Sequence, residues 1–130
     1  MNAAPKFRLI IAGTRGFVDL LTLSHVADNL LSDKLGTHDL EIVSGTARGA
    51  DQTGEAYAIS RGIPIKRMPA QWDRYGKSAG YRRNEEMAAY ADALLAFWDG
   101  ESRGTRHMIN IANERMLVVR VYNYLAGGFV

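Results

Sequence analysis

Short apolar runs alternate with longer amphipathic segments along the chain. The run at residues 7–12 is apolar and β-branched and ends at a glycine, which is typical of a buried strand entering a tight turn. Similar runs predict four more strands, at residues 40–43, 63–68, 93–98 and 117–121. Apolar residues at helical spacing predict helices at residues 18–35, 49–61, 81–90 and 104–115.

This alternation of strands and helices predicts an α/β fold. Strand–helix–strand units of this length form parallel sheets with right-handed crossovers, and continuous apolar strands suit burial on both faces. We expect a Rossmann-like three-layer sandwich, in which helices flank a five-stranded, mainly parallel sheet of order 3-2-1-4-5. Ligands of such sheets bind where the strand order reverses, which here lies between strands one and four.

The composition limits the classes of function. The 130 residues, of which 47% are hydrophobic, suit one domain covering residues 1–130. The chain has no cysteine, which fits a cytoplasmic protein, and no apolar run of the roughly 20 residues that would span a membrane. A formal net charge of +2 makes nucleic acid an unexpected partner. The three histidines lack metal-ligand spacing, so neither a metal nor a cofactor is predicted.

Glycines and polar residues cluster directly after three predicted strands, in loops at residues 13–16, 44–51 and 99–105. In a parallel sheet these loops share one edge, and each opens a helix whose free N–H groups and dipole attract an anion. Glycine is also common in such turns for structural reasons alone. Each loop contains an arginine, namely Arg15, Arg48 and Arg103. Because a guanidinium fork matches phosphate oxygens, the three loops together predict a phosphate site.

The connection at residues 69–80 is predicted to be a long irregular loop. The segment from residue 71 to residue 86 mixes aromatic and basic side chains, which stack on bases and hold phosphates. The same segment also fits a surface loop whose aromatic side chains pack on the core. A loop of this length in a compact domain is more often functional than idle. Two familiar phosphate motifs do not match, since residues 13–16 lack the G-x-G-x-x-G spacing and Gly76-Lys77-Ser78 lacks the first glycine of a Walker A loop.

Several segments resemble the SLOG superfamily, which joins the DNA-processing protein Smf/DprA with the Lonely Guy phosphoribohydrolases. They are G-T-R at residues 13–15, S-G-T-A-R-G-A-D at 44–51, R-N-E-E-M at 83–87, A-D-A at 91–93 and G-T at 104–105. The resemblance covers residues 7–121 and points to the small YspA/YpsA-related branch found in bacteria and their phages. It implies a Rossmann-like sheet and a nucleotide-like ligand.

The resemblance to the Lonely Guy enzymes is partial. Their strand-four loop reads P-G-G-x-G-T-x-x-E, and its glutamate is needed for N-glycosidic cleavage, assisted by an upstream arginine. Arg83 falls at the arginine position, and Gly104 and Thr105 match the G-T pair. Met108 stands at the glutamate position, and a methionine neither moves a proton nor stabilises an oxocarbenium-like centre. The resemblance therefore implies a ligand class rather than that reaction.

These observations predict a protein that binds a nucleotide or a nucleotide derivative, as a sensor or as a component of a nucleotide response. One alternative is a hydrolase that cleaves an N-glycosidic or phosphate bond of such a ligand, and single-stranded DNA binding is a second. The family resemblance and the apolar tail at residues 122–130 suggest a homodimer, although the tail also suits packing on its own domain.

The candidate site residues follow from the loops and from the resemblance. The candidate ligand-binding residues are Gly13, Thr14, Arg15, Ser44, Gly45, Thr46, Arg48, Gly49, Asp51, Arg83, Trp98, Gly104 and Thr105. Either Trp98 or Trp72 would stack on a base. Asp51 would hold a ribose hydroxyl or simply favour the helix dipole. The candidate catalytic residues are Arg83, Asp51, Asp99 and Glu101.

Overall fold

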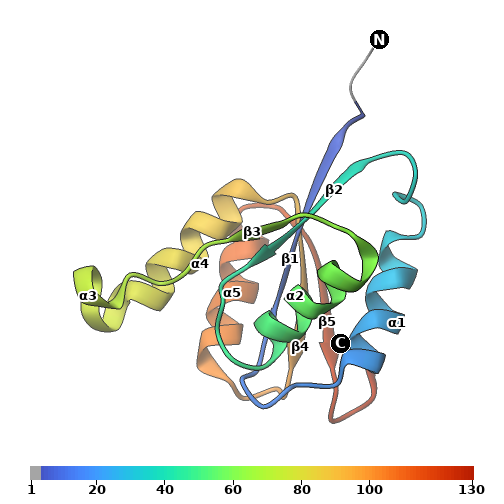
Figure 1. Cartoon of the computed structure of the whole chain (residues 1–130). Helices are drawn as coiled ribbons and strands as arrows, with labels where there is room; N and C mark the ends of the chain where they lie inside the picture. The colour runs from blue at the N-terminus through green and yellow to red at the C-terminus, as the bar shows by residue number, and fades with distance from the viewer. Residues whose placement is uncertain (1–3) are drawn as a thin grey trace.

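A twisted, mainly parallel sheet lies at the centre of the computed structural model, which describes residues 4–130 (Figure 1). Within these residues the sheet has six strands in the order β3-β2-β1-β4-β5-β6. The strands are β1 Lys6–Gly13, β2 Asp39–Ser44, β3 Ile65–Arg67, β4 Ala93–Trp98, β5 Val118–Asn123 and β6 Gly128–Phe129. The predicted Rossmann-like fold and strand order are confirmed, and β6 adds a sixth strand that pairs antiparallel with β5.

Helices cover both faces of the sheet (Figure 1). They are α1 Leu20–Leu31, α2 Ala50–Arg61, α3 Trp72–Tyr75, the 3₁₀ turn η1 Gly76–Ser78, α4 Ala79–Tyr90 and α5 Arg103–Glu114. Alternate residues of β1 face the two sides: Leu9 and Ile11 pack with α1 and α2, whereas Ile10 packs with α4 and α5. Each fully buried side chain of this size stabilises the fold by about 1.5–3 kcal/mol. None of the helices in the described part of the chain has the length and apolarity that crossing a membrane requires.

Helix α1 is shorter than the predicted helix at residues 18–35. Its first turn is capped by Asp19, whose carboxylate accepts a hydrogen bond of 3.1 Å from the backbone N–H of Thr22. After Leu31 the chain continues in turns, in which the N–H groups of Lys34 and Leu35 donate to the carbonyl of Leu31. Local hydrogen bonds therefore determine where the helix begins and ends, and both ends lie within the predicted residues 18–35.

The predicted irregular loop at residues 69–80 contains α3 and η1, and α4 begins at Ala79 instead of residue 81. We call residues 69–78 the α3 arm. The arm stands away from the rest of the domain and meets it at the beginning of α4 (Figure 1). Elements of three or four residues are too short to produce a visible periodicity, which explains why the sequence pattern did not reveal them.

The apolar tail packs on its own domain. The ring of Tyr122 lies 5.8 Å from that of Phe97, and Tyr124 lies 4.9 Å from Phe17. The chain then turns back, and Phe129 of β6 meets Tyr122 edge-on at 5.5 Å. These aromatic contacts attach the end of the chain to the α1 and α2 side of the sheet.

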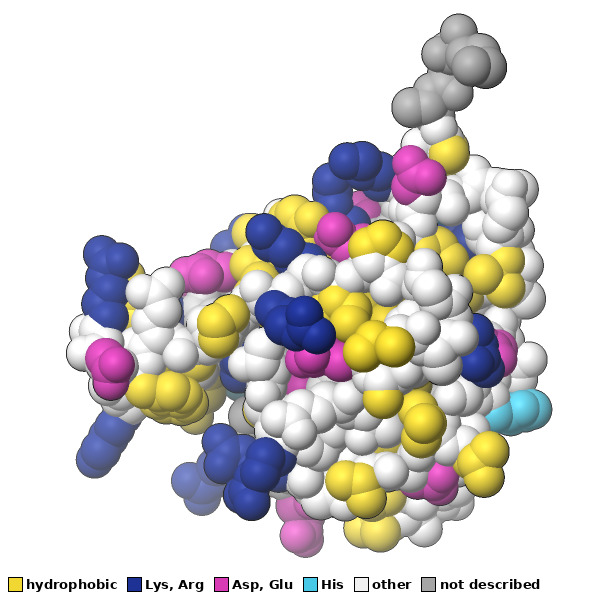
Figure 2. Space-filling view, viewed as in Figure 1, with side chains coloured by type: hydrophobic (Ala, Val, Ile, Leu, Met, Phe, Trp, Pro, Cys, Tyr) yellow, Lys and Arg dark blue, Asp and Glu magenta, His cyan; other side chains and the backbone are white. Residues whose placement is uncertain are grey.

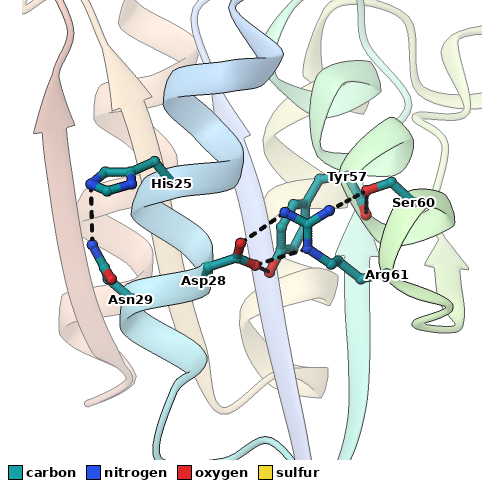
Figure 3. Close-up of polar contacts among 6 residues, drawn as sticks. All are labelled: His25, Asp28, Asn29, Tyr57, Ser60 and Arg61. Carbon is teal, nitrogen blue, oxygen red and sulfur yellow. Dashed lines mark hydrogen bonds and ion pairs between the residues drawn. The ribbon is translucent and has the colours of Figure 1, made fainter.

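A polar cluster joins α1 to α2 (Figure 3). The Arg61 guanidinium donates two hydrogen bonds to the Asp28 carboxylate, of 3.0 and 2.8 Å. The hydroxyl of Tyr57, whose side chain is fully buried, donates to the same carboxylate at 2.7 Å. Burial and the hydrogen bond to Asp28 both raise the pKa of Tyr57, so its hydroxyl stays protonated as a donor. The Asp28–Arg61 ion pair and the Tyr57 hydrogen bond therefore link α1 to α2.

Candidate functional site

A cleft of about 410 Å³ opens at the carboxyl ends of β1, β2 and β4, between their loops and the helices α4 and α5. This is the edge at which the strand order reverses between β1 and β4, the place expected for a ligand. The lining residues are Ala12, Gly13, Thr14, Arg15, Ala47, Asp51, Trp72, Lys77, Gly80, Tyr81, Arg83, Asn84, Met87, Ser102, Gly104, Thr105 and Met108.

A second cavity, of about 460 Å³, lies at the opposite edge of the sheet. Its charged groups compensate one another: the Arg8 guanidinium lies 3.9 Å from the Glu41 carboxylate and 4.6 Å from the centre of the Tyr90 ring. The Tyr90 hydroxyl also donates to Glu41. Because its arginine is already paired with a carboxylate, this cavity is a weaker candidate for an anionic ligand than the cleft.

Seven of the predicted ligand-binding residues come together in the cleft. They are Gly13, Thr14, Arg15, Asp51, Arg83, Gly104 and Thr105. The other predicted residues, which do not line it, are Ser44, Gly45, Thr46, Arg48, Gly49 and Trp98, together with the catalytic candidates Asp99 and Glu101. Several of these residues shape the loops instead.

The loop after β2 is built from internal hydrogen bonds. The buried Ser44 hydroxyl donates to Glu55 at 2.6 Å and accepts from the backbone N–H of Thr46 at 3.0 Å. Thr46 has a φ of 67°, an uncommon conformation for a residue with a side chain. Gly49 has a φ of 84°, and a Cβ there would collide with the carbonyl of Arg15. These contacts constrain the backbone conformation of the loop, and in this conformation Ala47 and Asp51 line the cleft.

The loop after β4 is held by Asp99. Its carboxylate accepts hydrogen bonds of 2.8 Å from the backbone N–H groups of Glu101 and Ser102, and these bonds lower its pKa. The indole N–H of Trp98 donates to the carbonyl of Ser102 at 3.1 Å. Asp99 and Trp98 thus position the first turn of α5, whose Gly104 and Thr105 line the cleft.

Arg83 is the partly buried cation of the cleft. Its Nε donates to Asn84 Oδ1 at 3.0 Å, and its Nη1 donates to the carbonyl of Gly45. Among residues 4–130 no carboxylate oxygen lies within 4.0 Å of this guanidinium. Burial lowers the pKa of Arg83, the negative charge of nearby Asp51 opposes this change, and the positive charge of Arg15 adds to the effect of burial. Arginine remains protonated in proteins, so a positive charge held by neutral oxygens faces the cleft.

Asp51 is a buried carboxyl beside Arg83. Its side chain is 5% exposed, and it accepts a hydrogen bond of 3.1 Å from the backbone N–H of Ala47. Burial raises the pKa of Asp51 from 3.8 to about 6, although the hydrogen bond and the charge of Arg83 oppose this change. Asp51 therefore exchanges its proton close to neutral pH, which is unusual for an aspartate.

Comparison with known proteins places the chain in a family. The family model described as "YspA, cpYpsA-related SLOG family" matches residues 7–75. The chain belongs to this SLOG family. It is similar to the Gene 61 protein of Mycobacterium phage D29, with 37% identity over an alignment of 114 residues that covers 82% of this chain and 89% of the phage protein. The predicted SLOG resemblance is confirmed, and a phage relative fits the predicted branch.

The solved structures include a similar fold. DNA processing protein A (DprA) from Streptococcus pneumoniae superposes with a TM-score of 0.69 at 16% identity. The aligned region covers 92% of this chain and 50% of the DprA chain. At this identity the likeness is one of fold, and it confirms the Rossmann-like architecture of the SLOG chain.

Sequence reasoning missed several residues of this SLOG cleft as ligand-binding candidates. Gly80, Asn84 and Met87 follow one another at i, i+4 and i+7 on α4, so they share the helix face on which Arg83 also borders the cleft. That spacing was available in the sequence once the beginning of α4 was known. Lys77 and Tyr81 flank this beginning, and Ser102 immediately precedes α5. No cluster of three or more His, Asp or Glu side chains suited to a metal ion occurs among residues 4–130.

Proposed function

We propose that this SLOG protein binds a nucleotide or a nucleotide derivative in the cleft between α4, α5 and the β1 and β2 loops. It would act as a sensor or as a component of a nucleotide response. Membership of the SLOG family supports a nucleotide-related function in general. The position of the cleft at the switch point of a doubly wound sheet supports a small-molecule ligand.

The observation that carries the proposal is the state of Arg83. Holding a partly buried guanidinium without a hydrogen-bonded carboxylate costs free energy, and the charge of Asp51, which lies beyond ion-pair distance, offsets this cost only in part. Arg15 lies near enough to repel it electrostatically, and Lys77 lines the same cleft. A bound phosphate would relieve the repulsion and accept charge-assisted hydrogen bonds from Arg83. The arrangement is therefore more favourable with an anionic ligand than without one.

The first turn of α5 supplies a second group of donors. Ser102, Gly104 and Thr105 lie on the cleft, and the helix dipole adds positive potential at this end. In Figure 2, Lys and Arg side chains stand both on the α3 arm and on the neighbouring body of the domain. The side of the molecule that carries the cleft is thus suited to a negatively charged ligand.

Thermal unfolding in the presence of ligands tests the proposal. We would measure the wild type, Arg83→Gln and Arg82→Gln with a panel of mono-, di- and cyclic nucleotides, NAD and ADP-ribose. A ligand at about 100 times its dissociation constant stabilises the folded state by about 2.7 kcal/mol. We expect one class of nucleotide to stabilise the wild type and Arg82→Gln but not Arg83→Gln. Absence of any shift across the whole panel would contradict the proposal.

Arg82→Gln is the matched control because Arg82 is the next residue on α4 and does not line the cleft. Its guanidinium instead lies 4.4 Å from the centre of the Tyr75 ring, and its Nε donates to the Ser78 hydroxyl at 3.2 Å. The two variants remove the same charge from neighbouring positions. A difference between them therefore reports on the cleft and not on the net charge of the protein.

Asp51 supports a second candidate function, the hydrolysis of an N-glycosidic or phosphate bond of the bound ligand. A carboxyl with a pKa of about 6 that lines the cleft suits general acid–base catalysis near neutral pH. Asp99 is committed to backbone hydrogen bonds, and Glu101 does not line the cleft. Incubating the stabilising nucleotide with wild type and Asp51→Asn, followed by chromatography for free base and phosphate, tests this function. Recovery of the intact nucleotide from the wild type would rule it out.

A further inference from the structure

The cleft has two unlike ends. One end lies over the strand ends and carries the charged and polar groups Arg15, Asp51 and Arg83. The other end lies at the α3 arm and the beginning of α4, which contribute the aromatic side chains Trp72 and Tyr81 to the lining. Phosphate and ribose suit the first end, whereas the second end suits a flat apolar group.

Trp72 is the large exposed aromatic side chain at the second end. It is 52% exposed, although a tryptophan ring gains more than most side chains from burial. Its Cη2 atom lies 3.4 Å from the position that a Cβ on Gly80 would take, so the ring edge rests against the bare backbone of α4. The ring is therefore packed against α4 along one edge and remains incompletely covered at the cleft.

Tyr81, which lines the cleft, packs against His107 of α5. Their rings lie 4.5 Å apart in an edge-on arrangement. The His107 Nδ1 is 3.1 Å from the Asn84 amide nitrogen, and the Asn84 carbonyl oxygen accepts the hydrogen bond from Arg83. The aromatic end is therefore connected to the charged end through one helix face. A ligand that touches both ends would span Arg83 and Trp72.

Trp98, the other tryptophan, is occupied elsewhere. Its indole N–H donates to the Ser102 carbonyl, and the Arg106 guanidinium lies 5.5 Å from the centre of its ring. It does not line the cleft. Of the two tryptophans, Trp72 alone is placed to meet a ligand there.

We infer that Trp72 is the residue that stacks on the base of the bound nucleotide, so that the protein selects base-bearing ligands over sugar phosphates. This inference rests on the proposed function, in which Arg83 holds the phosphate. Stacking is tolerant of base identity because every base has a π-face, and removing such a contact weakens binding by about 10- to 100-fold. The α3 arm, which carries Trp72, then determines the selectivity of the site.

Isothermal titration with AMP and ribose 5-phosphate tests the inference on wild type, Trp72→Ala and Trp72→Phe. We expect ribose 5-phosphate to bind the wild type at least about tenfold more weakly than AMP, and Trp72→Ala to bind both equally weakly. Trp72→Phe keeps an aromatic face and should retain most of the AMP affinity. Because Trp72 is half exposed, both variants are expected to fold, and thermal unfolding without ligand checks this.

Tryptophan fluorescence provides an independent measurement. AMP should quench the emission of the wild type but not that of Trp72→Phe, whose remaining tryptophan lies outside the cleft. The inference is overturned if ribose 5-phosphate binds as tightly as AMP, if Trp72→Ala keeps the AMP affinity, or if quenching persists in Trp72→Phe. Absence of AMP binding also overturns it, whereas the proposed function fails only if Arg83→Gln and the wild type respond alike to the whole nucleotide panel.

Discussion

Arg61 and Arg83 lie on helices that cover opposite faces of the sheet, and the protein treats their charges differently. Arg61 on α2 forms a bidentate pair of hydrogen bonds with the Asp28 carboxylate, beside the buried Tyr57 (Figure 3). Arg83 on α4 is held by an amide oxygen and a backbone carbonyl, both of them neutral. The first arginine is hydrogen-bonded to a carboxylate, whereas the second has the carboxyl of Asp51 nearby but beyond ion-pair distance.

This difference separates a structural charge from a binding charge. Arg61 is about two-fifths exposed, so its ion pair contributes modestly and chiefly fixes how α1 meets α2. Arg83 is more buried, and its charge, only partly offset by Asp51, faces a cleft where water exclusion strengthens any bond to an anion. A partly buried charge without a hydrogen-bonded counter-ion is typical of a functional site.

The strongest expected effect is the loss of ligand binding in Arg83→Gln. Removing a buried charged partner of an anionic ligand costs about 2–5 kcal/mol, which weakens binding by about 30-fold to several thousand-fold. The free energy of unfolding should change little, because glutamine relieves the cost of burying the charge. Titration calorimetry with AMP and urea denaturation measure the two quantities. Arg61→Gln should show the reverse pattern, and similar behaviour of the two variants would refute the comparison.

Asp51→Asn should remove a pH-dependent destabilisation. An aspartate whose pKa is 3.8 when unfolded and about 6 when folded favours folding in its protonated form, so its contribution is lost as pH rises from about 4 to 6. Asparagine stays neutral at all pH values. The stability advantage of Asp51→Asn over wild type should therefore grow with pH in this range, up to about 3 kcal/mol above pH 6. Urea denaturation at several pH values measures this difference.

The exposed Asp33 provides the control for this experiment. It lies in the turn after α1, next to Lys34, and its side chain is 72% exposed. Asp33→Asn removes the same formal charge far from the cleft. A pH-dependent gain in Asp33→Asn equal to that in Asp51→Asn would mean that the net charge of the protein, and not the burial of Asp51, causes the effect.

Asp28→Ala should destabilise the fold without affecting the ligand. It removes the acceptor of the buried Tyr57 hydroxyl, and leaving such a group without a partner costs about 1–3 kcal/mol. Tyr57→Phe combined with Asp28→Ala should recover part of this loss, because the unpaired hydroxyl is then absent. Urea denaturation measures the stability, and AMP titration should give the wild-type affinity. A loss of affinity in Asp28→Ala would show that the two regions are coupled.

Gly45→Ala should give the smallest effect, a weakening of AMP binding by about tenfold, or about 1.4 kcal/mol. A Cβ at this position would lie 2.6 Å from Arg83 Nη1 and 2.8 Å from an Asp51 carboxylate oxygen, so the guanidinium must move. Gly16→Ala is the control, since a Cβ there meets nothing within 4 Å. Equal affinity of the two variants would show that the position of the guanidinium is not critical.

The sequence by itself determined the fold and the edge of the sheet on which the cleft lies. The strand at residues 93–98 is apolar throughout, as expected for a strand that is covered on both faces. It lies in the interior of the sheet. The glycine-rich loops follow strands directly, and parallel strands bring such loops to one edge. For this reason Gly13, Asp51 and Gly104 were predicted from the pattern and meet in the cleft.

Only the tertiary structure decided which side chains of those loops face the cleft. Arg48 lies in a predicted loop yet stays exposed outside the cleft, because the turn at Thr46 directs the chain along one tight path. Trp98 follows its strand as predicted, but a hydrogen bond to Ser102 holds its ring elsewhere. Trp72 enters the cleft through the contact of its ring with Gly80. The direction of these side chains depends on contacts made in the folded structure, and the local pattern of apolar and polar residues does not reveal those contacts.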